Sequence, residues 1–427
     1  EDGIRDAQEA RGLGDVYKRQ EEDSESYRRL KSCRGKEGQI SAEGDFYRLA
    51  QGLEFYPCFI FNLMFNIYDI RFWLLPLIIL ITSDIGQDPV RKDPAKPLKH
   101  FTNPIFDGAD PWMIQKDKYY YYCFSSGNGI YVSRSEFITR RGKPVRVWQA
   151  PESGWNSSCV WAPELHYIDN HWYIYYAAGE SGPPYVHQKT GVLQSLNDDA
   201  LGGYKDLGTV YTGDNPDLKS DNIWAIDMTV FRHREKLYSV WSGWKKPAET
   251  DKTSQHLYIA EMENPFTVRS PRIKISSPLE PWETGGPLDL QEGPQVLKKG
   301  DNLFIVYSCR ESWTIDYRLG ILKLKNPGSD PLSPESWEKT GPVFSGPFGT
   351  GHCSFVKSPD GLEDWIIYHS KKSVKEGWQN DIRAQRFGWD SKGYPVFGEA
   401  VNTGESLVRP SGEYRLEKKL KRTGKAF

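Results

Sequence analysis

The chain has 427 residues, enough for a large buried core and, as a prior, for two or three domains. Its formal net charge is −2 with both signs well mixed, which excludes the basic excess that a nucleic-acid-binding surface normally shows. Aromatic residues make up 14% and are accompanied by 39 Gly and 28 Pro, a composition that favours strands with frequent turns over helices.

The N-terminal part of the chain is interpreted as targeting sequence and not as fold. Residues 72–81, FWLLPLIILI, are strongly apolar but number only ten, whereas a membrane-spanning helix needs about 20. They fit the core of a signal peptide over 64–83, which begins at Met64 and offers Ser83 near the cleavage point; a buried strand or an anchor is the alternative. We therefore expect a secreted protein with no membrane segment in its mature form.

The residues on either side of this signal peptide are also excluded from the fold. Residues 1–63 are interpreted as a non-native leader, because 1–20 resemble translated sequencing-adapter sequence and the stretch shows no sustained helical or strand period. Residues 84–99 are rich in Pro and Lys and are interpreted as a linker.

From residue 100 onward, one unit of sequence occurs five times. Each copy has a polar residue, a short apolar strand, a polar turn and then an aromatic strand. The leading polar residues, at separations of 54, 63, 65 and 60 residues, are Asp110, Glu164, Asp227, Glu292 and His352. Strand units that repeat at roughly this period are typical of a radial array, so the sequence predicts an all-β, five-bladed β-propeller over residues 100–408.

The six cysteines show no CxxC or other metal-ligand spacing. Cys123 and Cys309 lie inside the aromatic runs YYYYCF and FIVYSC, which is typical of small buried side chains. A disulfide among the last four cysteines stays open, because spacing alone does not pair them.

The propeller geometry brings the five leading residues together. The innermost strand of each blade lines the central channel, so equivalent positions converge near the axis. Four carboxyl groups and one histidine would then share a small cleft, where like charges raise one another's pKa. The alternative is five unrelated, solvated turn residues, which leaves the regular spacing unexplained.

Paired carboxyl groups in an aromatic-lined cleft suit the hydrolysis of acetals. One, kept protonated, donates a proton to the departing glycosidic oxygen, while the other, kept ionised, activates water or attacks the sugar. A third carboxyl group can position the acid and tune its pKa. Four indole rings near the leading residues are either core or platforms that stack on sugar rings: Trp112, Trp161, Trp224 and Trp313.

Five motifs carry a family resemblance. In chain order they are NPIFDGADPW, WAPELH, IWAIDMTVF, QEGPQV and GPFGTGHCSFVKSPDG, and they closely resemble glycoside hydrolase family 43 from about residue 100 to residue 400. The resemblance implies a five-bladed propeller and an inverting enzyme of the group that includes arabinofuranosidases, xylosidases and arabinanases.

The same resemblance assigns roles to four of the leading residues. Asp110 in GADPW is expected to be the general base that activates water, and Glu292 in QEGPQ the general acid. Asp227 in AIDMT is expected to orient Glu292 and raise its pKa. His352 in GHCSF matches a histidine beside a calcium ion reached mostly through water, since calcium prefers oxygen ligands. No cofactor is expected to be required, and calcium is expected only as a structural ion.

Two further residues have weaker assignments. Arg383 lies in the fifth unit, where the family often places an arginine that contacts substrate. Glu164 occupies a leading position outside the catalytic three, and it is interpreted either as a structural partner of the WAP turn or as a substrate contact.

Motifs such as WAPELHYIDNHWYIYYAAG resemble the exo-acting α-L-arabinofuranosidase branch of the family. We therefore expect a monomer that releases α-L-arabinofuranosyl units from arabinan or arabinoxylan in plant cell walls. β-Xylosidase and endo-arabinanase are alternatives within the family. A non-catalytic carbohydrate-binding propeller is the alternative outside enzymes, and the presence of all three acids disfavours it.

Two surface features complete the prediction. The basic tail 409–427 is expected to be solvated or to lead to another module, with an anionic surface as an alternative partner. The sequon Asn156-Ser157-Ser158 predicts glycosylation in a surface loop in a eukaryotic secretory pathway.

Overall fold

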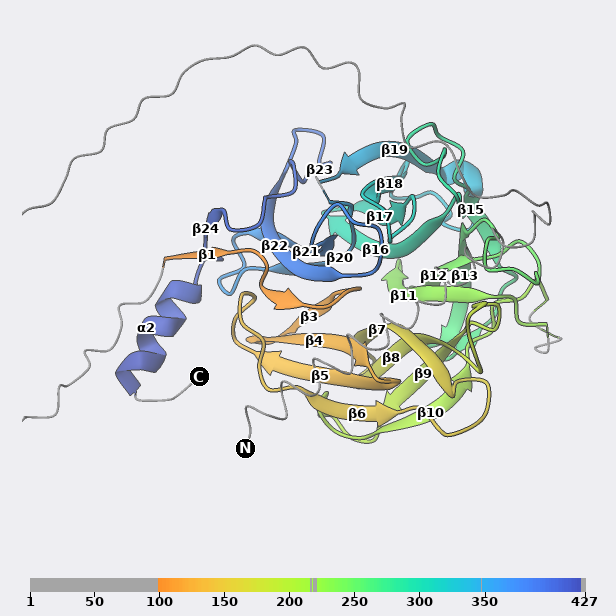
Figure 1. The fold of residues 1–427 in the computed structure, drawn as a ribbon, viewed down its shortest axis with the longest axis horizontal. Coiled ribbons are helices and arrows are strands. Elements are labelled where there is room, and N and C mark those ends of the chain that lie inside the picture. The colour runs from red at the N-terminus through yellow and green to blue at the C-terminus, as the bar shows by residue number, and fades with distance from the viewer. Residues whose placement is uncertain (1–98, 216, 218–220, 347, 424–427) are drawn as a thin grey trace, which may run out of the picture. The chain divides into compact units, whose positions relative to one another are not determined.

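The computed structural model describes residues 99–423 except 216, 218–220 and 347. Within these residues, antiparallel strands form five blade sheets around a common axis and one short two-stranded sheet (Figure 1). This is the five-bladed β-propeller that the repeat predicts. The predicted leader, signal peptide and nearly all of the linker lie outside the described residues.

The first strand named for each blade is the one nearest the axis. Blade 1 contains β3 (Trp112–Lys116), β4 (Tyr119–Ser126), β5 (Gly129–Ser135) and β6 (Val145–Gln149). Blade 2 contains β7 (Ser158–Ile168), β8 (His171–Gly179), β9 (Lys189–Ser195) and β10 (Tyr204–Thr209). Blade 3 contains β11 (Ala225–His233), β12 (Lys236–Gly243), β13 (His256–Asn264), β14 (Thr267–Val268) and β15 (Ile273–Ser276). Blade 4 contains β16 (Gln291–Lys299), β17 (Asn302–Cys309), β18 (Arg318–Leu324) and β19 (Trp337–Phe344), with the 3-10 helix η1 (Pro334–Ser336) before β19. Blade 5 contains β20 (Thr350–Lys357), β21 (Asp364–Lys371), β22 (Asn380–Trp389), β23 (Pro395–Val396) and β2 (Phe106–Asp107).

Blade 5 is completed by a strand from the other end of the propeller. β2 pairs with β22, with Phe106 opposite Ile382. β1 (His100–Thr102) pairs with β24 (Ser406–Val408), which joins the same two ends again. This closure covers a sheet edge that would otherwise be free to pair with another chain. It also places Asp110, three residues after β2, where the chain passes from blade 5 to the innermost strand of blade 1.

The hydrophobic core lies between the blades, with one cluster of buried side chains at each of the five blade interfaces. Each blade is therefore covered on both faces, which explains why strands such as β17, NLFIVYSC, read as continuous apolar and aromatic runs. The four cysteines among the described residues are free, and Cys123, Cys309 and Cys353 are buried in this core. The prediction of small buried side chains is confirmed for Cys123 and Cys309, and no disulfide forms among these four.

The segment after blade 5 differs from the solvated tail that its basic composition suggests. It forms α2 (Glu413–Thr423), and Glu413 is fully buried. The Glu413 carboxylate accepts hydrogen bonds from the backbone nitrogens of Ile138 at 2.6 Å and Thr139 at 3.1 Å. Arg140 forms an ion pair with the buried Glu417 at 2.9 Å. Buried acidic side chains thus attach a basic helix to blade 1.

The sequon at Asn156 is also placed differently from the prediction. Asn156 is 3% exposed, and its amide nitrogen donates to the Tyr176 hydroxyl at 2.7 Å and to Asp206 at 2.8 Å. Both amide hydrogens are therefore in use inside the protein. The prediction of a surface glycosylation site is wrong for this conformation.

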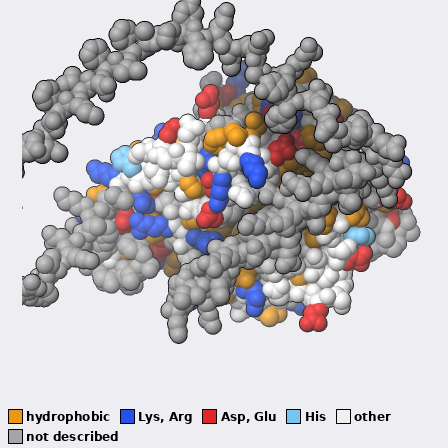
Figure 2. All heavy atoms as spheres, viewed as in Figure 1, with side chains coloured by type: hydrophobic (Ala, Val, Ile, Leu, Met, Phe, Trp, Pro, Cys, Tyr) orange, Lys and Arg blue, Asp and Glu red, His pale blue; other side chains and the backbone are white. Residues whose placement is uncertain are grey.

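The described part of the chain contains no helix with the length and apolar character needed to cross a membrane. On the face drawn in Figure 2, acidic and basic side chains are interspersed, in keeping with the mixed charges of the sequence.

Candidate active site

One backbone feature recurs in all five blades at the start of the innermost strand. A residue with φ in the left-handed region stands there: Asp110 (49°), Ala162 (41°), Asp227 (55°), Gly293 (54°) and His352 (41°). In blades 2 to 5 the pairing with the second strand shifts register across this residue, as at a β-bulge. Because bulges re-aim side chains, this position is where each blade turns a residue out of the interblade packing and toward the axis.

This feature corrects the predicted phase of the repeat. Asp110, Asp227 and His352 occupy the left-handed position, as equivalent leading residues should. Glu292 does not, because it precedes Gly293 by one residue, and Glu164 follows Ala162 by two. The prediction that all five leading residues are equivalent is therefore wrong in blades 2 and 4.

The structure nevertheless brings the four principal residues together; we call Asp110, Asp227, Glu292 and His352 the axial site. His352 Nδ1 lies 3.2 Å from Asp110 Oδ1, which joins blades 5 and 1. The backbone nitrogen of Gly293 donates to Asp227 Oδ2 at 2.9 Å, which joins blades 4 and 3. Asp227, Glu292 and His352 are buried, whereas the Asp110 side chain is 36% exposed and is open to water.

Gly293 lets the His352 ring lie close to the backbone. A Cβ atom at position 293 would be 3.1 Å from His352 Nδ1 and 3.2 Å from its Cγ. Ala162 keeps a Cβ at the equivalent position with a similar φ, so the backbone conformation alone does not exclude a side chain. At position 293 the imidazole would in addition have to move by a few tenths of an ångström.

Asp110 is held in its ionised form. Partial burial would by itself raise the pKa of Asp110, but the neighbouring His352 and His369 imidazoles outweigh it and lower the pKa to about 2. The backbone nitrogen of Asp110 also donates to His369 Nδ1 at 3.1 Å, which fixes the carboxylate relative to blade 5. An ionised, solvent-accessible carboxylate suits the activation of water.

Glu292 and Asp227 behave in the opposite way. Burial raises the pKa of Asp227 to about 6, opposed by His352 and reinforced by Asp110. Burial, followed by the charge of Asp227, raises the pKa of Glu292 well above its ordinary value. The Tyr317 hydroxyl donates to Glu292 Oε1 at 2.9 Å and partly offsets that shift. The two groups therefore titrate as a pair, and the larger upward shift favours Glu292 as the group that carries the proton.

Glu164 lies one layer deeper in the channel. Two positions beyond the left-handed residue, blades 2 to 5 present Glu164, Thr229, Gln295 and Ser354, which we call the second layer. Glu164 is 2% exposed, pairs with His166 Nε2 at 3.0 Å and accepts a hydrogen bond from Gln295. Thr229 also bonds to it. Glu164 thus contacts the strands that carry Asp227 and Glu292, in agreement with the structural alternative.

Burial also decides the charge of this layer. It raises the pKa of Glu164 to about 8, against the opposing hydrogen bonds from Thr229 and Gln295. Burial lowers the pKa of His166 to about 3, so its imidazole is neutral. The second layer therefore adds no charge beneath the axial site at neutral pH.

Two residues at the axial site were missed by the sequence analysis. Tyr317 bonds to Glu292, and its ring stacks on His369 with centroids 5.4 Å apart. His369 in turn contacts Asp110, so these two side chains link Glu292 of blade 4 to Asp110 of blade 1. His369 directly follows the apolar run WIIY in the fifth copy of the repeat, which is a usable signal. Tyr317 is one of 24 tyrosines and carries none.

The tryptophans predicted to line the cleft lie in different surroundings. Trp112 packs on His166 with ring centroids 4.6 Å apart and donates to the Leu165 carbonyl, so it belongs with the second layer. Trp224 is 7% exposed and stacks on Trp244 at 4.5 Å, which leaves it in the core. Trp161 is half-buried at the position in blade 2 that corresponds to Glu292.

The fourth tryptophan and the predicted arginine lie further from the axis. Trp313 is half-buried in the loop between β17 and β18. Arg383 is fully buried in β22, where its Nε bonds to Asp381 Oδ1 at 2.7 Å. In this structure the guanidinium is enclosed and paired, which fits a structural role, and the predicted substrate contact of Arg383 stays a prediction.

Connections between the second and third strands form the rim at the same end as the axial site. This connection is shortest at blade 1, residues 127–128, which we call the low side, and it is longer in the other blades: 180–188, 244–255, 310–317 and 372–379. These longer loops brace one another. The Tyr185 nitrogen donates to Asp251 at 3.1 Å, Lys252 lies 5.1 Å from the Trp313 ring, and the Gly377 nitrogen donates to the Trp313 carbonyl at 2.9 Å. The rim is therefore continuous from blade 2 to blade 5.

The donor set around His352 bears on the calcium that the family resemblance implies. Among the described residues, no three His, Cys, Asp or Glu side chains are placed to hold a metal together. His352 Nδ1 already faces Asp110, and the oxygens of Glu164 in the second layer already have partners. Because calcium takes six to eight oxygen ligands, these residues fit only an ion held largely through water.

The sequence also matches known proteins. The sequence profile of glycosyl hydrolases family 43 matches residues 101–395, which include every residue of the axial site. The chain belongs to glycosyl hydrolases family 43. It is therefore a glycoside hydrolase by family, and the predicted family is confirmed.

Individual family 43 proteins are similar over most of the described chain. An extracellular exo-α-(1→5)-L-arabinofuranosidase of Streptomyces avermitilis is 30% identical over 358 residues, covering 80% of this chain and 72% of that protein. An α-L-arabinofuranosidase 43 of Humicola insolens is 30% identical over 338 residues, covering 74% of this chain and 66% of that protein. The crystal structure of an α-L-arabinofuranosidase from Lactobacillus brevis superimposes with a TM-score of 0.64 at 29% identity, covering 71% of this chain and 98% of that one.

Proposed function

We propose that this protein is a secreted, inverting, exo-acting α-L-arabinofuranosidase that removes α-L-arabinofuranosyl units from arabinan or arabinoxylan in plant cell walls. The single observation that carries the proposal is that one axial site holds two carboxyl groups in opposite surroundings. Asp110 is open to water beside two imidazoles that lower its pKa, whereas Glu292 is buried and its pKa is raised by burial and by Asp227. The printed activities of the relatives, above all the Streptomyces exo-enzyme, support the choice of sugar.

In the proposed reaction Asp110 accepts a proton from a water molecule as that water attacks the anomeric carbon. Glu292 donates its proton to the glycosidic oxygen as the bond to the leaving sugar breaks. The sugar leaves with a new hydroxyl on the opposite face, and Asp110 has gained the proton that Glu292 has lost. Transfer through solvent then restores both groups for the next cycle.

The neighbouring residues keep the two acids in these opposite states. His352 and His369 lower the pKa of Asp110. Asp110 therefore stays ionised until the attacking water gives up its proton. Asp227 contributes a negative charge that discourages ionisation of Glu292. It also accepts the N–H of Gly293, so it positions the backbone next to the acid.

Exo action is supported by the rim. Loops braced from blade 2 to blade 5 favour a site that admits one chain end from the low side at blade 1 over a groove open at both ends. β-Xylosidase and endo-arabinanase are the alternatives to be separated by assay. Products from arabinan, arabinoxylan and xylo-oligosaccharides distinguish them: arabinose alone supports the proposal, xylose or arabino-oligosaccharides the alternatives.

We further propose that the enzyme acts as a monomer without a required cofactor, and that any calcium beside His352 is structural. Prolonged dialysis against EDTA is then expected to leave kcat on 4-nitrophenyl α-L-arabinofuranoside unchanged. Loss of activity that calcium restores would contradict this part of the proposal. Secretion is supported by the apolar run 72–81 and by the extracellular relative.

The experiment that tests the assignment of the acid is Glu292→Gln. Hydrolysis of an arabino-oligosaccharide, whose poor leaving group needs a proton, should fall by about 100-fold or more, whereas an aryl arabinofuranoside with a good leaving group should lose much less. Glu152→Gln, at an exposed position before blade 2, is the control and should behave as wild type. Equal losses on both substrates would argue against Glu292 as the acid.

A further inference from the structure

Exposed apolar side chains gather on the rim of blades 4 and 5. Ile315 is 44% exposed, Val374 66% and Trp378 40%, and all three lie on the two neighbouring loops 310–317 and 372–379. The half-buried Trp313 joins them, with its ring centroid 5.6 Å from that of Trp378. We call these four residues the rim platform. Exposed apolar side chains grouped near a polar active site commonly mark a place where a ligand rests.

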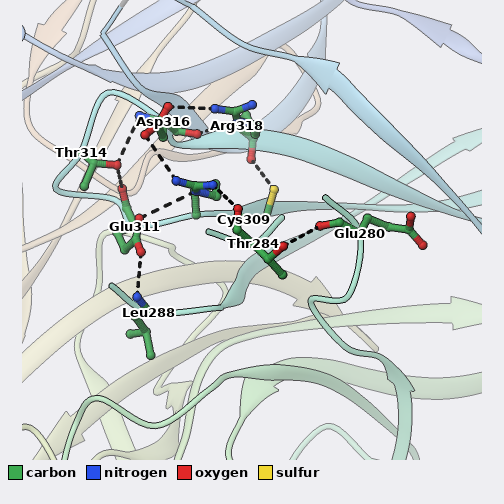
Figure 3. A network of polar contacts seen from close by, with 9 residues as sticks. Glu280, Thr284, Leu288, Cys309, Glu311, Thr314, Asp316 and Arg318 are labelled. Atoms are coloured by element: carbon green, nitrogen blue, oxygen red, sulfur yellow. Dashed lines mark hydrogen bonds and ion pairs between the residues drawn. The ribbon is translucent and has the colours of Figure 1, made fainter. Parts of the chain in front are cut away.

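The loop that carries Trp313 is held rigidly by polar contacts (Figure 3). Glu311 is fully buried and accepts a hydrogen bond from the Leu288 nitrogen at 2.8 Å. Thr314 donates to the Glu311 carbonyl from both its nitrogen at 3.0 Å and its hydroxyl at 2.9 Å. Arg318 bonds to Asp316 at 3.1 Å. The backbone that carries Trp313 is therefore fixed on both sides of this residue, which reduces the entropy lost when a ligand orders the loop.

The adjoining loop is tied to the first. The Gly377 nitrogen donates to the Trp313 carbonyl at 2.9 Å, and Lys371 reaches the Gly377 carbonyl. Trp378 therefore follows a residue that is fixed to the loop of Trp313. Lys252 from blade 3 lies over the Trp313 ring, with its Nζ 5.1 Å from the ring centroid, and adds a hydrogen-bond donor to the rim platform.

The rim platform lies on the side of the site where the leaving group must be. The proposed acid, Glu292, is bonded by Tyr317, which belongs to the same eight-residue loop as Trp313. Four residues of chain span at most about 14 Å, so Trp313 is within that distance of Tyr317 along the backbone. A sugar whose glycosidic oxygen receives the proton of Glu292 would begin beside Tyr317 and extend toward this loop.

We infer that the rim platform binds the neutral pentose units on the leaving-group side of the scissile bond, with Trp313 and Trp378 stacking on the sugar rings. The indole faces match the C–H faces of a pentose, and Lys252 can donate to a ring hydroxyl. The inference rests on the proposed function, and it adds that this enzyme selects oligomeric substrates over simple arabinosides.

The test is Trp378→Ala in the full chain, assayed on 4-nitrophenyl α-L-arabinofuranoside and on linear arabinotriose and arabinopentaose. KM for the two oligosaccharides should rise roughly three- to tenfold, the loss expected for one aromatic contact. The aryl arabinoside, which has no sugar on the leaving side, should keep its KM and kcat within about twofold. Phe266→Ala is the matched control, since Phe266 is 42% exposed and lies in the turn between β13 and β14.

Three results would overturn the inference, and they are distinguishable. If wild type cleaves the aryl arabinoside but Trp378→Ala matches Phe266→Ala on all substrates, the rim platform binds no sugar. If Trp378→Ala converts a dimer to a monomer on a sizing column without changing oligosaccharide KM, the patch is a contact between copies of the chain. If wild type cleaves no arabinofuranoside, the proposed function fails and the inference fails with it.

Discussion

Glu164→Gln tests the electrostatic description of the channel with a magnitude that follows from the structure. The pKa of Glu164 is raised from 4.5 to about 8, mainly by burial, so the native protein holds a proton that the unfolded chain releases above pH 4.5. A raised native pKa means that stability is complete below the unfolded value and is lost as pH rises toward the native value. Over these roughly 3.5 pH units the loss amounts to about 5 kcal/mol.

Glutamine reproduces the protonated acid without its titration. Its oxygen can accept from Gln295 and its amide can donate to the neutral His166, as the carboxylic acid does. Wild type and Glu164→Gln should therefore have similar stability near pH 4.5. By pH 9 the variant should be relatively more stable by about 5 kcal/mol, because only wild type bears the cost of ionising a buried carboxyl group.

The assay is urea unfolding followed by tryptophan fluorescence at pH 4.5, 6, 7.5 and 9. Taking the difference between the two proteins cancels the other titrating groups, and Glu152→Gln serves as an exposed control whose difference from wild type should not change with pH. A constant difference between wild type and Glu164→Gln across this range would refute the reasoning, because it would mean that Glu164 is ionised in the native state.

Three further predictions concern the acid and its support. Asp227→Asn removes a charge that raises the pKa of Glu292, so the alkaline limb of the kcat/KM–pH profile should move to lower pH. An unmoved limb would show that the charge of Asp227 does not act on Glu292. Tyr317→Phe removes a hydrogen bond that favours ionised Glu292, so the same limb should move to higher pH, and a shift in the other direction would contradict the assignment. Gly293→Ala places a Cβ 3.1 Å from His352 Nδ1 and should lower kcat by tenfold or more with a stability loss of about 1–3 kcal/mol. Thermal unfolding and kcat close to those of wild type would show that His352 can move away freely.

Much of the fold could be predicted because few structures other than buried strands require the residue types of the repeat. Continuous aromatic and apolar runs such as that of β17 are needed where a blade is covered on both faces, and five copies at similar spacing leave the number of blades in little doubt. The catalytic roles of Asp110, Asp227 and Glu292 came from the family motifs and remain predictions. The structure adds that these three lie in one axial site.

The phase of the repeat could not be predicted, because a β-bulge adds a residue that composition does not reveal. A shift of one residue sends a strand side chain to the other face. Glu292 therefore reaches the axial site from the position before Gly293. Glu164 stands two positions after Ala162 and lies in the second layer. The Pro that follows Asp110, Ala162 and Gly293 is the one local mark of this position, and it is absent in blades 3 and 5.

Other errors share a different cause, which is that burial of a polar side chain depends on partners far away in sequence. Asn156 bonds to Asp206, 50 residues on, and Glu413 bonds to Thr139, 274 residues back. No local pattern distinguishes these residues from exposed ones of the same type.

The measurement that tests the central claim most directly is the configuration of the first sugar released. Proton NMR of 4-nitrophenyl α-L-arabinofuranoside hydrolysis, recorded before the product mutarotates, should show the anomeric signal of the β-configured arabinose. That result requires water activated by Asp110 to attack opposite the leaving group. An initial signal of the α-configured sugar would mean retention through a covalent intermediate, and would contradict the roles proposed here for Asp110 and Glu292.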